Sequence, residues 1–73
     1  MDTWTRKPYN MLLNDVGLYR SAKKAVATPV LWDAAQQLKA LLSPRLGDWA
    51  VLVNWAELAI MVKEKSNAEN QGL

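Results

Sequence analysis

The most regular pattern of apolar and polar positions runs through the middle of the chain. Apolar residues recur there three and four positions apart, at Leu31, Ala34, Ala35, Leu38, Leu41 and Leu42. This spacing predicts an amphipathic helix whose apolar stripe faces a core. The opposite side is polar, at Asp33, Gln36, Gln37 and Lys39. Trp32 lies on the flank, where we expect it to pack at the edge of the core. We predict Thr28 as the N-cap and Pro29 as the first helical residue, with Ser43-Pro44 ending the helix.

A second apolar segment, DWAVLVNWAELAIMV, occupies residues 48–62. Asp48 is a suitable N-cap, so we predict one helix from Trp49 to about Lys65. A strand is the alternative for residues 50–55. We favour the helix because the run is long and lacks a strict two-residue alternation.

The predicted helix over residues 48–62 has an unusually wide apolar surface. One face carries Trp49, Leu52, Val53, Ala56 and Ile60. An adjacent face carries Val51, Trp55, Leu58 and Val62. Such a helix is either central in the core or partly free to bind a partner or a second copy of the chain. The run is shorter than the roughly 20 apolar residues of a membrane span, and Asn54 and Glu57 interrupt it, so we expect no span.

The N-terminal half is best explained by two helices that are separated at Gly17. We predict a short helix over residues about 9–15 and a left-handed turn at the glycine. A second helix then begins at Leu18, with apolar residues at Leu18, Ala22, Ala25 and Val26. Its basic residues point away from that stripe, at Arg20, Lys23 and Lys24.

These elements predict an all-α fold, a compact bundle of three to four helices with polar tails. Residues 1–73 form a single helical domain, because the chain is too short for a second core. Residues about 1–5 and 66–73 are expected to be flexible tails.

The composition argues against catalysis. The chain contains neither Cys nor His, so it lacks thiolate ligands and the commonest general base. No Gly-rich phosphate loop or nucleophile elbow is present, and the seven Asp and Glu are scattered. We therefore expect no enzyme activity, no metal and no cofactor, and the lack of Cys is compatible with a reducing cytoplasm.

The net charge of +2 is unevenly spread. Residues 1–27 carry five of the nine Lys and Arg but only two of the seven Asp and Glu. Residues 28–73 carry the other four basic residues and five acidic ones. This basic end favours an anionic partner, either nucleic acid or an acidic protein surface. An ordinary solvated surface is the alternative.

Aromatic residues lie beside cations in the segment DTWTRKPYN. Trp4 and Tyr9 bracket Arg6 and Lys7, a composition typical of interaction hot spots. Alternatively, the two aromatic side chains fold back over a small core.

The segment NDVGLYRSAKKAV, residues 14–26, contains a second candidate surface. It resembles the turn and recognition helix of the Cro-type phage repressors, in Val16-Gly17-Leu18-Tyr19, Ser21-Ala22 and Ala25-Val26. The resemblance implies a helix in the DNA major groove. The residues it would present to DNA are Arg20, Ser21, Lys23 and Lys24. Leu13 and Lys23 depart from the family's pattern, where a small and an apolar residue are expected. A basic helix that faces solvent is the alternative.

The chain as a whole is similar to small phage-encoded regulators, of the Xanthomonas phage type, that bind the host bacterial RNA polymerase. The likeness rests on the length of 73 residues, the absence of Cys and His, the helical patterning and the basic N-terminal end. It implies action in the bacterial host cytoplasm as a monomer or weak dimer. It also implies binding to the polymerase core, a weakened hold of sigma factor, inhibition of transcription initiation and, in some cases, antitermination. Placed on the basic end, the partner-binding residues would be Trp4, Arg6, Lys7, Tyr9, Arg20, Lys23 and Lys24. A DNA-binding repressor and a helical interaction or dimerisation module remain as alternatives.

Overall fold

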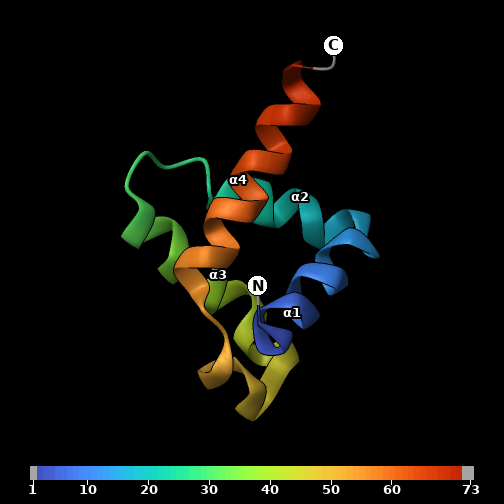
Figure 1. Cartoon of the computed structure of the whole chain (residues 1–73), viewed down its shortest axis with the longest axis vertical. Coiled ribbons are helices and arrows are strands. Elements are labelled where there is room, and N and C mark those ends of the chain that lie inside the picture. The colour runs from blue at the N-terminus through green and yellow to red at the C-terminus, as the bar shows by residue number, and fades with distance from the viewer. Residues whose placement is uncertain (1, 72–73) are drawn as a thin grey trace.

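Four α-helices and one 3-10 helix make up the fold in the computed structural model, which describes residues 2–71 (Figure 1). The elements are α1 (Thr3–Leu13), α2 (Val16–Ala25), α3 (Leu31–Leu46), η1 (Gly47–Leu52, the 3-10 helix) and α4 (Trp55–Gln71). The described part contains no strand. The predicted all-α bundle of three to four helices is therefore confirmed.

The N-terminal helix is longer than predicted, and the turn lies elsewhere. α1 spans eleven residues from Thr3, and the turn to α2 consists of Asn14 and Asp15. The prediction of a left-handed turn at Gly17 is wrong, because this glycine lies inside α2. The cause is Asp15, whose Oδ1 accepts the Leu18 N–H at 3.0 Å and so caps α2 two residues before Gly17.

Pro8 lies inside α1, where a proline normally leaves a helical carbonyl without a donor. The carbonyl in question, four residues earlier, belongs to Trp4. The indole N–H of Trp49 donates to that oxygen at 2.9 Å and replaces the missing helical hydrogen bond. A contact between distant parts of the chain thus allows α1 to run through the proline.

The stripe predicted for the middle helix is largely confirmed, whereas its ends are not. Its buried residues in α3 are Ala34, Ala35, Leu38 and Leu42. The helix begins at Leu31, because the Thr28 hydroxyl accepts the Val30 N–H at 3.4 Å in a turn before the helix. It continues through Pro44 to Leu46 and ends at Gly47, whose φ of 59° suits glycine.

Trp32 does not pack at the edge of the core as predicted. Its side chain is 69% exposed. The position lies on the outer side of α3, next to the exposed Leu31 and Asp33, so no neighbouring helix covers it.

The single helix predicted from Trp49 is interrupted. η1 ends at Leu52, Val53 is extended with ψ 134°, and α4 begins only at Trp55. The break is held by Asn54, whose N–H donates to the Thr5 hydroxyl at 3.0 Å and whose side-chain Oδ1 accepts the Glu57 N–H at 3.1 Å. This asparagine, rather than Asp48, therefore caps the long C-terminal helix.

Residues 3–5 and 66–71, which the sequence assigns to tails, are helical. At the N-terminal end, Asp2 Oδ1 accepts the Thr5 N–H at 2.7 Å and caps α1. At the other end, the last turns of α4 project beyond the other helices (Figure 1) and are tied to α2 through Glu69. Residues 1, 72 and 73 lie outside the described part.

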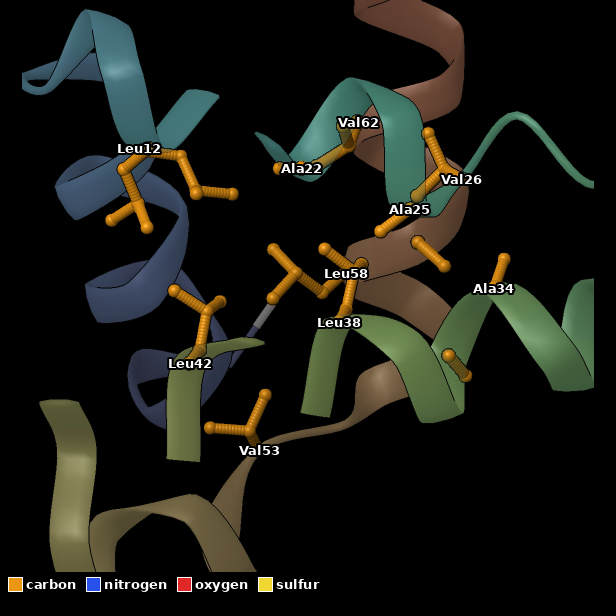
Figure 2. Close-up of a cluster of buried hydrophobic side chains, with 13 residues drawn as sticks. Leu12, Ala22, Ala25, Val26, Ala34, Leu38, Leu42, Val53, Leu58 and Val62 are labelled. Atoms are coloured by element: carbon orange, nitrogen blue, oxygen red, sulfur yellow. The ribbon is translucent and has the colours of Figure 1, made fainter. Parts of the chain in front are cut away.

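All four helices contribute to one core (Figure 2). Its fully buried large side chains include Leu12, Leu38, Leu42, Leu58 and Val62. The apolar segment 48–62 therefore supplies the core through Leu58 and Val62, although its Val51, Leu52 and Ile60 remain exposed. No helix within residues 2–71 is both long enough and apolar enough to cross a membrane.

Candidate functional site: a basic groove along helix α1

Helix α1 has two sides with opposite roles. Thr5, Pro8 and Leu12 are buried, three and four residues apart, and face the core. The outer side is polar and exposed, at Thr3, Arg6, Lys7, Asn10 and Asn14. The helix therefore presents a continuous polar face while its apolar face anchors it.

A groove of about 560 Å³ runs along this outer side, between α1, the start of α2 and the end of α3. Its lining residues are Thr3, Arg6, Lys7, Asn10, Met11, Asn14, Asp15, Leu18 and Arg45. Most of them are exposed, whereas Met11 is half-buried and Leu18 is buried. The groove thus combines cations and amides with an apolar portion.

The charges along the groove are unbalanced. Arg6, Lys7 and Arg45 supply three positive charges, and Asp15 supplies the single carboxylate of the lining. That carboxylate already accepts the Leu18 N–H as the cap of α2. Arg6 and Arg45 form no ion pair within residues 2–71, so their guanidinium groups are available to an anionic ligand.

An aromatic cluster lies at the N-terminal end of α1. The rings of Trp4 and Trp49 meet edge to face with centroids 4.9 Å apart. The Lys7 ammonium lies 4.1 Å from the centroid of the Trp49 ring, a cation–π contact that fixes its position. Trp4 is still 43% exposed, which leaves part of its ring open to a partner, whereas Tyr9 is half-buried against the core. The alternative expectation, that these side chains fold back over the core, therefore describes Tyr9 better than Trp4.

The cations of α2 differ from one another. Arg20, Ser21 and Lys24 are exposed. Lys23 is tied into the fold, because its Nζ lies 3.7 Å from Glu69 Oε2 and 5.1 Å from the centroid of the Tyr19 ring. Its charge is therefore partly compensated, and it is less available to a ligand than Arg20 and Lys24.

The same cluster changes the titration of Tyr19. Burial raises the pKa of Tyr19 to about 12, and the neighbouring Glu69 carboxylate adds to this shift. The neutral phenol donates to Glu69 Oε1 at 3.2 Å. This end of α2 is consequently a structural junction between α2 and α4.

The turn of the helix-turn-helix resemblance does not match the structure, because α2 begins at Val16, before Gly17. In that comparison Gly17 belongs to the turn between the two helices, whereas it lies here in the first turn of α2. The Ser21 hydroxyl donates to the Gly17 carbonyl at 3.3 Å. Arg20 and Lys24 remain exposed on α2 for any ligand.

Sequence reasoning missed Arg45, Asn10, Asn14 and Trp49 as members of this surface. The spacing of Arg6, Asn10 and Asn14 places them on one face once α1 is known to start at Thr3. Arg45 carries no such signal, because only the tertiary fold brings the end of α3 to the groove that α1 lines.

Comparison of the chain with protein-family models, with characterised proteins and with solved structures finds no match. Within residues 2–71 no group of three or more Asp and Glu is arranged to hold a metal ion.

Proposed function

We propose that this protein is a phage-type transcription regulator that binds the host bacterial RNA polymerase through the basic surface of α1 and α2. It acts by binding and not by catalysis. Its binding weakens the hold of sigma factor on the polymerase core, inhibits initiation at host promoters and favours antitermination.

The observation that carries this proposal is the basic groove with its free guanidinium groups. Exposed cations beside exposed aromatic and apolar side chains are typical of protein-binding hot spots. Arg6 and the partly exposed Trp4 supply this combination at one end of α1. The similarity to small phage regulators, in length, composition and helical patterning, supports polymerase as the protein partner.

DNA is a weaker candidate partner for this surface. A small DNA-binding domain usually presents a contiguous basic stripe. The net charge here is only +2, Lys23 is paired with Glu69, and the groove contains an apolar portion. The exposed Arg20, Ser21 and Lys24 still favour a DNA-binding repressor as the alternative function.

The test is retention of purified bacterial RNA polymerase by the tagged protein after nuclease treatment. We expect the double charge reversals R6E/K7E and K23E/K24E to weaken binding by about tenfold or more, since they reverse the exposed charges of Arg6, Lys7 and Lys24. The matched control is Lys39→Glu, an exposed charge reversal on α3 away from the groove. Circular dichroism shows whether each variant keeps its helices.

Unchanged binding in both double variants would contradict the placement of the surface. A wild-type protein that retains no polymerase would contradict the function. If that protein instead shifts duplex DNA, with affinity that falls steeply with salt, the repressor alternative takes its place.

A further inference from the structure

We propose that the groove along α1 binds an acidic peptide segment of the partner protein, with Arg6 and Arg45 holding its carboxylates. This inference rests on the proposed function and specifies which kind of polymerase segment the protein takes. It also adds Arg45, on α3, to a surface that otherwise consists of α1 and α2.

Charge complementarity is the first argument. Three cations against one carboxylate line the groove, and that carboxylate is occupied in capping α2. Arg6 and Arg45 come from different helices and make no ion pair within the described residues. A guanidinium group binds a carboxylate through two parallel hydrogen bonds, so two such groups favour a ligand with at least two acidic side chains.

The neutral part of the lining fits a peptide. Asn10 and Asn14 each carry an amide that both donates and accepts, which matches the alternating N–H and C=O groups of a peptide backbone. Met11 and Leu18 supply an apolar contact, and methionine adapts readily to ligands of different shape. The segment should therefore carry an apolar side chain between its acidic ones.

The length of the groove sets the size of the segment. α1 has eleven residues, which at 1.5 Å per residue makes it roughly 16 Å long. An extended peptide advances about 3.3 Å per residue, so about five residues match the helix.

Asp15 makes a nucleic acid the poorer ligand. Its carboxylate lines the groove and is held there by the Leu18 N–H at 3.0 Å. A phosphate chain along α1 would lie beside this negative charge, whereas a peptide can offer it a backbone N–H. The buried Leu18 offers nothing to a phosphate.

The direct test uses two synthetic blocked peptides of equal length, Glu-Leu-Glu-Glu-Leu-Glu and Gln-Leu-Gln-Gln-Leu-Gln. Each is titrated into the isotopically labelled full-length protein and followed by NMR. We expect the acidic peptide to shift the amide resonances of Asn10, Asn14, Leu18 and Arg45.

Arg45→Glu and the milder Arg45→Gln should both weaken this binding, by about tenfold for the reversal. Lys39→Glu, an exposed reversal on α3 outside the groove, is the matched control and should leave it unchanged.

The proposal would be overturned if the glutamine peptide shifted the groove resonances as much as the acidic peptide. It would also be overturned if the acidic peptide shifted no resonance of the groove residues. A third contradicting result would be a short DNA duplex that shifts these resonances in wild type but not in the Arg45 variants, while the acidic peptide shifts none of them.

Polymerase binding by the same variants separates this inference from the proposed function. If wild type binds polymerase, Arg45→Glu should bind about tenfold more weakly; equal binding would place the interface outside the groove while the function stands. If wild type binds no polymerase but the acidic peptide occupies the groove, the function fails and the peptide site stands.

Discussion

The two sides of α1 differ: one packs into the core, whereas the other lines the groove that we propose as the binding site. Thr5, Pro8 and Leu12 face inward and are buried, whereas Arg6 and Asn10 face the groove. Neighbouring residues such as Thr5 and Arg6 therefore have different roles. Substitutions on the inner side should change the free energy of unfolding, and substitutions on the groove side should change binding with little effect on stability.

The strongest test of this comparison is Leu12→Ala on the inner side. Leu12 is fully buried among side chains from the other helices (Figure 2), so its truncation leaves a cavity. We expect a loss of about 2–5 kcal/mol in the free energy of unfolding, measured by urea denaturation with circular dichroism. The matched control is Leu13→Ala, the same change one residue later at a position that is 45% exposed. There we expect about 1 kcal/mol or less, and equal losses would contradict the assignment of the two sides.

Thr5→Val tests the polar contact of the inner side. The buried Thr5 hydroxyl accepts the Asn54 N–H at 3.0 Å and so joins α1 to the start of α4. Valine keeps the shape but leaves that N–H without its acceptor. We expect a loss of about 1 kcal/mol in the free energy of unfolding, since a partly buried donor loses its partner.

Thr5→Ser keeps the hydroxyl and is the control for this change. If the valine variant is as stable as the serine variant, the hydrogen bond to Asn54 does not stabilise the junction.

The junction of α2 and α4 provides a third test, because its cation, Lys23, pairs with Glu69 and does not line the groove. The pKa of Tyr19 is raised from 10.0 to about 12, so the neutral phenol is favoured in the folded state. Its contribution to stability is complete below pH 10 and is lost as the pH rises toward about 12. This is expected to be the smallest of the three effects, because the cluster is partly exposed.

The measurement is the urea midpoint as a function of pH for wild type and Tyr19→Phe. The wild-type midpoint should fall more steeply across this alkaline window than that of the variant. Parallel curves would show that the phenol does not couple α2 to α4.

The candidate surface was only partly predictable. Arg6, Lys7, Arg20 and Lys24 are exposed as their charge suggests. The charge pattern predicts the same for Lys23, yet Lys23 pairs with Glu69, in the segment that the sequence predicts as a tail. The sequence does not single out Asn10 and Asn14, because it predicts a helix that begins only near residue 9. Their shared face with Arg6 becomes apparent only when α1 begins at Thr3.

The predicted helix boundaries are wrong where two nearby residues could each cap the helix. Asp15 and Gly17 both suit the start of a helix or a turn, and a hydrogen bond to Leu18 decides in favour of Asp15. The same holds for Asp48 and Asn54 in the C-terminal segment. Each cap contributes about 1 kcal/mol, so the choice depends on what the rest of the fold adds.

Local patterns in the amino-acid sequence are enough to predict the helical class, the buried stripe of α3 and the basic character of the N-terminal end. These follow from local periodicity and charge, which need no knowledge of distant neighbours. Three other features depend on the tertiary fold: the passage of α1 through Pro8, the break before α4 and the position of Arg45 in the groove. The first two depend on Trp49 donating to Trp4 and on Thr5 accepting from Asn54, partners that lie 45 and 49 residues apart. The third depends on helix packing, and no local pattern in the chain encodes such long-range contacts.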